Sequence, residues 1–184
     1  LFGIQSRGGC SCAGPYGHRL LGIDLDESME FEREIVRGCE GIKPGWVRVN
    51  FNYFISQATF EFLLAAVEWV ATHGWKLLPD YVFDADTGKW THATTLHRPT
   101  MRLSDVSYRD GRMSYRTRRM TEPEWALQSY VELADGVVKN AEERASAREI
   151  HDPPRNPDFE QLRWFPLPSE AHAQLLATIA AAGN

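Results

Sequence analysis

The 184-residue sequence predicts an α+β fold, in which a small, mostly antiparallel sheet carries helices on one face. The order of the predicted elements is mixed: strand, helix, strand, helix, two hairpins and two helices. Asp86-Thr87-Gly88 and Asp110-Gly111 each lie between short alternating stretches and predict the two hairpins. With 43% hydrophobic and 24% charged residues, the composition is that of a globular domain.

The first half of the chain contains two predicted strands and two predicted helices. Residues 1–6 form a short strand that enters a glycine-rich loop, and residues 28–37 form a short helix closed by Gly38. After a turn at Pro44-Gly45, residues 45–51 alternate as a second strand.

The clearest helix follows, with Ser56 as N-cap and Gly74 as its C-terminal stop. Apolar residues at the 3.6-residue period predict its buried face: Phe60, Leu63, Leu64, Val67 and Val70 or Ala71. Phe62 and Trp69 widen this apolar stripe, which indicates packing on more than one side.

The second half begins with the two hairpins and ends in two helices. Thr121 and Glu124 form a capping box before a long helix, whose core stripe is Leu127, Val131, Ala134 and Val138. Residues 151–159 are predicted to be a linker, and Ser169 starts a final helix. We expect residues 1–98 to form the main domain and residues 99–184 a hairpin and helical extension.

Charge and hydropathy limit the possible partners and location. The net charge of −5 gives no reason to expect a nucleic acid or an anionic membrane as a partner. No apolar run approaches the roughly 20 residues that a membrane helix needs, and residues 1–15 lack the features of a signal peptide. Three cysteines are an odd number, so we expect a reducing, cytoplasmic environment instead of a disulfide framework.

The loop from Arg7 to Pro15, RGGCSCAGP, contains two of the three cysteines. Its glycines allow unusual backbone dihedrals, and the nearby guanidinium favours the nucleophilic thiolate. The alternative is that Cys10 and Cys12 are small buried residues. Cys10, together with Tyr16 and His18 that follow the loop, is a candidate for lining a pocket. Cys10, Cys12 and His18 do not have the spacing of a structural zinc site, so no metal is predicted.

This loop resembles the active-site loop of the cysteine desulfurases and their class V aminotransferase relatives. In that family a short strand precedes an Arg, a Gly two positions on, a Cys five positions after the Arg, then Ala and Pro. Arg7, Gly9, Cys12, Ala13 and Pro15 match this pattern. The resemblance therefore implies that Cys12, and not Cys10, is the nucleophile.

A second segment, RVNFNYFISQATFEFLLAAV, resembles the family's next signature, in which an arginine precedes an aromatic residue, a turn and a helix. Arg48 takes the place of the arginine that binds the substrate carboxylate, and Phe54-Ile55-Ser56 that of the turn. We expect Arg7 to bind the substrate as well. The resemblance covers about residues 1–78. It implies the small C-terminal domain of a fold-type-I enzyme that uses pyridoxal phosphate and an amino-acid substrate, and whose full-length parent is a homodimer.

The chain departs from the family pattern in two respects. The desulfurases have histidine just before the nucleophile, where this chain has Cys10-Ser11, so we favour the aminotransferase-like chemistry. A Cys-x-Cys loop also resembles the molybdenum-cofactor sulfurases, which stay an alternative. None of the lysines, Lys43, Lys76, Lys89 and Lys139, has the setting of the cofactor lysine. We therefore expect a missing N-terminal large domain to supply it, and this chain alone to be inactive.

Two further interpretations stay open. Seven arginines lie between residues 98 and 119, and their alternation with Met113 and Tyr115 favours a solvated hairpin face, with an interface as another possibility. The alternative to the enzyme hypothesis is a binding or regulatory module that keeps the loop without catalysis.

Overall fold

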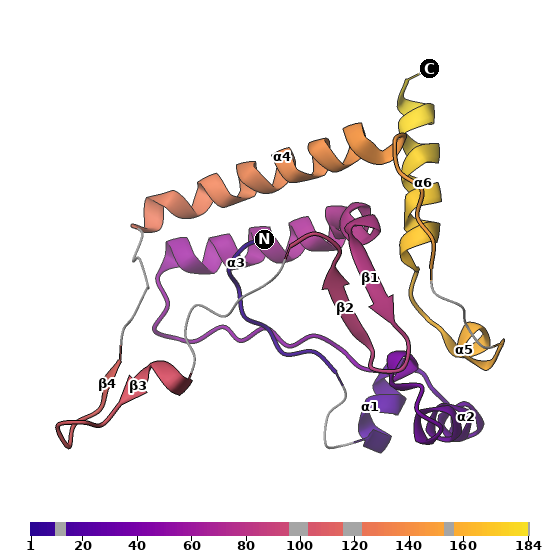
Figure 1. The fold of residues 1–184 in the computed structure, drawn as a ribbon, viewed down its shortest axis with the longest axis horizontal. Coiled ribbons are helices and arrows are strands. Elements are labelled where there is room, and N and C mark those ends of the chain that lie inside the picture. Colours follow the sequence, from indigo (N-terminus) through magenta and orange to yellow (C-terminus); the bar gives the residue numbers. More distant parts are fainter. Residues whose placement is uncertain (10–13, 96–102, 116–122, 153–156, 184) are drawn as a thin grey trace.

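The fold is described from a computed structural model, which places residues 1–9, 14–95, 103–115, 123–152 and 157–183. Helices and short antiparallel strands are mixed along the chain, as the α+β prediction requires (Figure 1). The α-helices are α1 (Gly14–Leu21), α2 (Leu25–Val36), α3 (Gln57–His73), α4 (Leu127–Ala145), α5 (Pro157–Leu162) and α6 (Pro168–Ala182). Short 3₁₀ helices are η1 (Glu40–Ile42), η2 (Gly74–Asp80), η3 (Leu103–Asp105) and η4 (Glu124–Ala126).

The described strands form two separate two-stranded sheets instead of one small sheet. β1 (Tyr81–Asp84) pairs antiparallel with β2 (Lys89–His92), and β3 (Val106–Ser107) pairs antiparallel with β4 (Ser114–Tyr115). Gly88 and Gly111 have positive φ angles of 66° and 68° in the two turns, where glycine avoids a steric penalty. Both predicted hairpins are therefore confirmed.

The predicted strands at residues 1–6 and 45–51 are wrong as regular strands. Their segments run side by side but share a single isolated antiparallel bridge, between Arg7 and Arg48 (Figure 1). Gly3 has a φ of 65° and Gly9 a φ of 108°, values outside the β region, so the first segment cannot extend a ladder. We call these two segments, residues 1–9 and 44–52, the ribbon.

The helix predicted from residue 28 begins earlier, at Leu25. The Asp24 side chain accepts a hydrogen bond from the Glu27 backbone N–H at 2.9 Å and so caps the helix. The Ser56 cap of α3 is confirmed, because its hydroxyl accepts a hydrogen bond from Thr59 N–H at 3.1 Å. The predicted stop is also confirmed, because α3 ends at His73 with Gly74 as its C-cap. The φ of Gly74 is −57°, so this cap is not left-handed, and the chain continues into η2.

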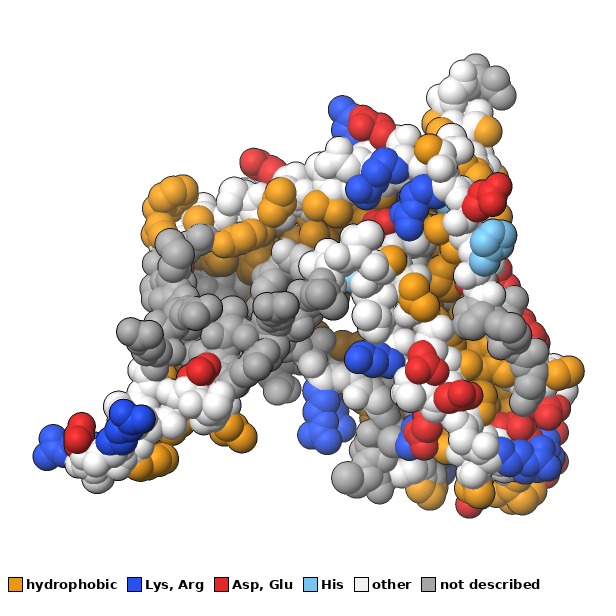
Figure 2. All heavy atoms as spheres, viewed as in Figure 1, with side chains coloured by type: hydrophobic (Ala, Val, Ile, Leu, Met, Phe, Trp, Pro, Cys, Tyr) orange, Lys and Arg blue, Asp and Glu red, His pale blue; other side chains and the backbone are white. Residues whose placement is uncertain are grey.

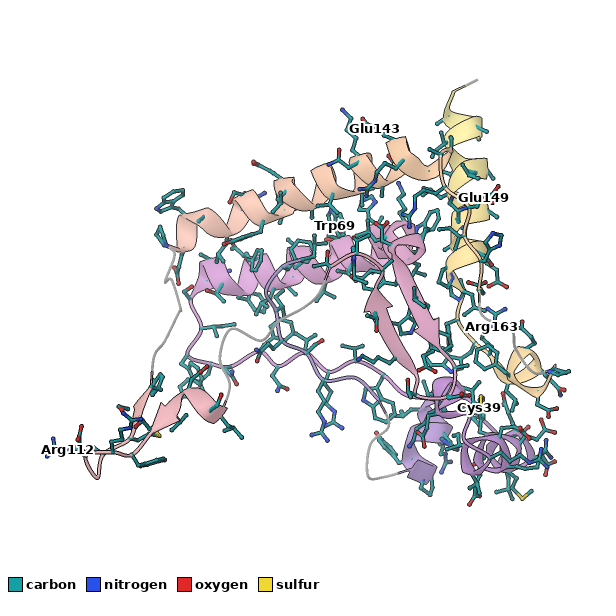
Figure 3. The ribbon with its side chains drawn as sticks, in the orientation of Figure 1. Cys39, Trp69, Arg112, Glu143, Glu149 and Arg163 are labelled. Carbon is teal, nitrogen blue, oxygen red and sulfur yellow. The ribbon has the colours of Figure 1, made fainter. Side chains whose placement is uncertain are left out.

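The buried face predicted for α3 is wrong. The buried residues are Phe62, Ala66 and Trp69, whereas Leu64, Val67 and Val70 are 46%, 45% and 51% exposed. The reason is the position of α4, which lies along the Trp69 side of α3, as Figure 3 shows. Trp69 packs against Ala134 and Val138 of α4, and its indole N–H donates a hydrogen bond to Asp135 at 2.7 Å.

Helix α4 buries the core stripe that the sequence predicts for it. Ala134 and Val138 of α4 are buried, and the stripe continues through Ala141 and Ala145. The proposed cap residue Thr121 lies outside the described residues.

Two predictions near the C-terminus are corrected. Part of the linker at 151–159 is helical, because α5 begins at Pro157. Ser169 is not the cap of α6, which starts one residue earlier with Leu167 as N-cap; instead the Glu170 carboxylate accepts from Leu167 N–H at 2.9 Å. Arg163 links α5 to α6 by donating to Glu160 and Glu170 at 3.0 and 2.7 Å (Figure 3).

Two hydrophobic clusters lie within the described residues. One contains Trp69, Ala134 and Val138; the other is built mainly of aromatic and branched side chains: Phe31, Ile42, Phe83, Phe159, Leu162 and Leu167. Both clusters combine residues from before and after the predicted domain boundary at residues 98 and 99. That boundary lies in a part of the chain that the structure does not describe, and it stays a prediction. Within the described residues, no helix has the length and apolar character to cross a membrane.

Candidate functional site

The bridge between Arg7 and Arg48 joins the two segments that carry the sequence motifs. Arg7 N–H donates to the Arg48 carbonyl at 3.5 Å, and Arg48 N–H donates to the Arg7 carbonyl at 2.8 Å. Residues that exchange both hydrogen bonds in this way lie directly opposite each other, so their side chains leave the ribbon on the same face. The backbone thus places both guanidinium groups on one face of the ribbon.

Such a pair of like charges is unfavourable unless something neutralises it. Both arginines are exposed, and neither forms an ion pair with an acidic residue in the described part of the chain. Both are therefore available to an external anion. A planar guanidinium presents paired N–H donors that match a carboxylate or phosphate.

The two arginines line a groove of about 520 Å³. Uncharged polar side chains share its wall with them: Gln5, Ser6, Asn50 and Asn52. Ile4, Val49 and Leu63 complete the lining on the side of α3. The lining residues include no carboxylate, so their side chains offer hydrogen-bond donors and positive charge to a small anionic ligand.

An apolar groove of about 490 Å³ lies next to it. It shares Ile4, Ser6 and Val49 with the arginine groove and extends along the exposed side of α3, past Val67 and Val70. The face of α3 that the sequence predicts to be core is therefore the open wall of this second groove.

The cysteine loop, residues 7–15, begins in the ribbon at Arg7. Trp46 N–H donates to the Gly9 carbonyl at 3.3 Å, which fixes the last described residue before the cysteines. Gly45 allows this approach, because a Cβ there would lie 2.5 Å from the Gly9 carbonyl carbon. Cys10 and Cys12 themselves are outside the described residues, so the nucleophile assigned to Cys12 stays a prediction.

Tyr16 and His18 lie on α1, after the loop. Tyr16 is exposed, and His18 Nδ1 lies 2.8 Å from the Ser28 hydroxyl, which ties α1 to α2. Neither residue is part of the arginine groove. Their role as pocket residues stays a prediction.

None of the four lysines of the chain lies in the arginine groove. Lys43 pairs with Glu40 at 3.2 Å, and Lys76 pairs with Glu142 at 2.7 Å. Lys89 lines a different cavity beside Tyr81 and His92, and Lys139 is exposed on α4. The residues of this chain therefore do not fit the covalent site of pyridoxal phosphate at this groove.

The described residues form neither a metal site nor an activated thiol. Among the described residues no three His, Cys, Asp or Glu side chains gather as a metal site. Burial raises the pKa of the Cys39 thiol, with smaller contributions from the negative charges of Asp86 and Glu34. At neutral pH this thiol is therefore even less ionised than an ordinary cysteine.

Sequence reasoning identified both arginines but missed the asparagines of the groove. The signal was present in the stretch Arg48-Val49-Asn50-Phe51-Asn52, where polar residues occupy every second position. Such alternation places the polar side chains on one face of an extended segment. Comparisons with protein-family models, curated protein sequences and solved structures find no match to this chain.

Proposed function

We propose that this chain is the small C-terminal domain of a pyridoxal-phosphate enzyme that resembles the class V aminotransferases and cysteine desulfurases, acting on an amino acid. The observation that carries the proposal is the bridge between Arg7 and Arg48. The two motifs come from separate parts of the sequence, and the bridge gives them one site with the charge that an amino-acid carboxylate requires.

In this role Arg48 binds the substrate carboxylate through two parallel N–H donors, and Arg7 supplies a second positive charge on the same face. Asn50, Asn52 and Gln5 orient the bound group with neutral hydrogen bonds. The cofactor would act as an electron sink at the substrate. Its lysine would come from a large domain outside this chain, and the present chain contributes substrate binding and the cysteine loop.

Ligand binding to the purified chain tests the carboxylate site directly. Titration of L-cysteine, followed by NMR chemical shifts, should perturb the ribbon residues, whereas cysteamine, which lacks the carboxylate, should not. Arg48→Gln should weaken binding about tenfold or more, because a charge-assisted hydrogen bond contributes roughly 1.5–3 kcal/mol. Lys139→Gln, which removes an exposed charge on α4, is the matched control. Equal binding of both compounds, or unchanged binding by Arg48→Gln, would contradict the proposal.

A second candidate function is a binding module without catalysis, which the absence of lysine from the groove favours. It predicts the same carboxylate binding but no cofactor chemistry, whichever segments accompany the chain. Incubation of the parent protein with pyridoxal phosphate, reduction with borohydride and mass spectrometry separates the two functions. A single labelled lysine in the large domain supports the enzyme, and no specific label supports the binding module.

A further inference from the structure

The arginine groove contains more positive charge than a single carboxylate neutralises. Its lining includes two guanidinium groups and no acidic side chain. Both arginines are exposed, and neither forms an ion pair with a residue in the described part of the chain. Figure 2 shows acidic side chains gathered over α2, α5 and the β1–β2 turn, to one side of the ribbon. The balancing negative charge therefore has to come from the ligand.

The backbone of the ribbon lets both arginines reach one small molecule. Arg7 and Arg48 exchange their backbone hydrogen bonds, and in such a pair the two Cα atoms lie about 5.5 Å apart. Two long, flexible side chains that start at this separation can each bind a different anionic group of the same ligand. The groove of about 520 Å³ has the size of a pocket for a whole small molecule.

Amide side chains extend the donor surface on both segments of the ribbon. Gln5 lies two residues before Arg7. Asn50 and Asn52 lie two and four residues after Arg48. This spacing places side chains on one face of an extended segment, and all of these residues line the groove. Each amide has an NH₂ group that can donate to an oxygen, so there are donors for two acidic groups.

We infer that the substrate is an amino acid with an acidic side chain, and so carries two anionic groups. Arg48 binds its α-carboxylate, as in the proposed function, on which this inference rests. Arg7 binds the acidic group of the side chain. Arg7 is therefore the residue that determines which amino acid is preferred.

A neutral amino acid matches the groove less well. Its zwitterion has one carboxylate and one ammonium group, whose charges cancel, so the occupied groove would stay positive. A ligand that covers the groove also removes water from the second guanidinium, and a charge that loses water without gaining a partner is costly. An acidic amino acid has one net negative charge at neutral pH and gives each guanidinium an anionic group.

Two matched pairs of ligands isolate the second anionic group: L-aspartate with L-asparagine, and L-glutamate with L-glutamine. The members of a pair have nearly the same shape and differ in the charge of the side chain. Dissociation constants for the complete chain are measured from NMR chemical shifts of the ribbon residues, at about 50 mM salt to limit screening. The acidic member of at least one pair should bind about tenfold more tightly, the effect of one further charge-assisted hydrogen-bonded pair.

Variants of the complete chain assign this preference to one arginine. Arg7→Gln should bring the dissociation constants of the acidic and neutral members together, whereas Arg7→Lys, which retains the charge, should keep part of the difference. Arg48→Gln should weaken binding of all four ligands, because each has an α-carboxylate. Lys139→Gln removes one positive charge from an exposed position on α4 and should keep the full difference. Circular dichroism checks that the variants are folded.

The possible failures are distinguishable. Equal binding within both pairs, with binding that still depends on Arg48, would overturn the second anionic site and leave the carboxylate site of the proposed function in place. Binding of none of the four ligands would contradict both. A preference that persists in Arg7→Gln, or that disappears equally in Lys139→Gln, would overturn the role of Arg7, since general attraction by positive charge would then explain it.

Discussion

At the scale of single residues, close backbone approach decides where the candidate site forms. Arg7 and Arg48 face the same groove because the ribbon segments come together at their bridge, and the approach of Gly45 to Gly9 holds the adjacent loop. In the contact between α3 and α4, a single side-chain hydrogen bond fixes the local arrangement. The indole of Trp69, for example, is buried but places its N–H on Asp135. Both features lead to predictions about individual substitutions.

Replacement of Gly45 by alanine should loosen the cysteine loop. The new Cβ would lie 2.5 Å from the carbonyl carbon of Gly9 and 2.7 Å from its oxygen, and both are backbone atoms that cannot rotate away. We expect a loss of about 1–3 kcal/mol in the free energy of unfolding, a typical cost of overpacking. Gly14→Ala is the control: a Cβ there meets open space at the start of α1, and the change should stabilise by about 0.4–1 kcal/mol. Urea denaturation measures both, and equal effects would contradict the prediction.

Removal of the Asp135 carboxylate should leave the indole N–H of Trp69 without its partner. We expect Asp135→Ala to lower the free energy of unfolding by about 1–2 kcal/mol, because an unsatisfied buried donor loses its solvation. Asp135→Asn retains a carbonyl oxygen that can accept the bond and should cost clearly less. Denaturation monitored by circular dichroism compares the two, and an equally large loss in both variants would show that the hydrogen bond is not the cause.

At the scale of elements, local chemistry fixes turns and caps, while packing against other elements decides which face of a helix is buried. The β1–β2 turn has its own hydrogen-bond network, in which Asp84 Oδ1 accepts from the N–H groups of Asp86 and Thr87 at 3.0 and 3.3 Å. Helix α3 shows the other case. It is apolar on both sides, and α4 covers the side of Trp69, so the second apolar side stays exposed.

The Asp84 network predicts a pH-dependent contribution to stability. The hydrogen bond from the Thr87 side chain, followed by the backbone N–H groups of Thr87 and Asp86, lowers the pKa of Asp84. A lowered pKa means that the unfolded chain binds the proton more readily. The contribution is therefore present at neutral pH and is lost as the pH falls through the folded-state pKa.

The variant Asp84→Asn, whose side chain does not titrate, makes this measurable. We expect the wild type to be more stable than the variant at pH 7, with the difference disappearing as the pH falls through the lowered folded-state pKa of Asp84. Urea midpoints across this range give the result. A difference that stays constant with pH would show that ionisation of Asp84 contributes nothing.

At the scale of the whole molecule, contacts between distant parts of the sequence form both hydrophobic clusters. Phe31, Ile42 and Phe83 from the first half pack with Phe159, Leu162 and Leu167 from the second. Arg148 adds a polar link by donating to Asp80 and to the Pro79 carbonyl, the latter at 3.0 Å. The two halves therefore depend on each other for burial of their apolar side chains.

Separation of the halves tests this dependence. Residues 1–98 produced alone should show no cooperative unfolding transition, because Phe31, Ile42 and Phe83 lose their partners. Addition of residues 99–184 should restore a single transition if the halves reassociate. Cooperative unfolding of residues 1–98 alone, with near-ultraviolet circular dichroism like that of the full chain, would show instead that the predicted first domain is independent.

The sequence predicted those parts of the fold and of the candidate site that depend on short-range chemistry. Asp-Thr-Gly and Asp-Gly turns, the Ser56 cap and the stripe through Ala134 and Val138 are all present, because each depends on residues a few positions apart. Both groove arginines were also predicted, through their motifs. Asn50 and Asn52 were missed, although their alternation with Val49 and Phe51 places them on the face of Arg48; that this face lines a groove is decided by the approach of the other ribbon segment.

By itself, the sequence determined the mixed helix and strand content, the hairpins and the presence of two arginine-bearing motifs. Only the tertiary structure decided that Arg7 and Arg48 are paired, which face of α3 is buried and that, among the described strands, β3 and β4 pair only with each other. The physical reason is the same in each case. Periodicity reports which residues are apolar, but the choice between two apolar faces depends on which distant element packs there. Backbone pairing likewise depends on segments that the sequence does not relate.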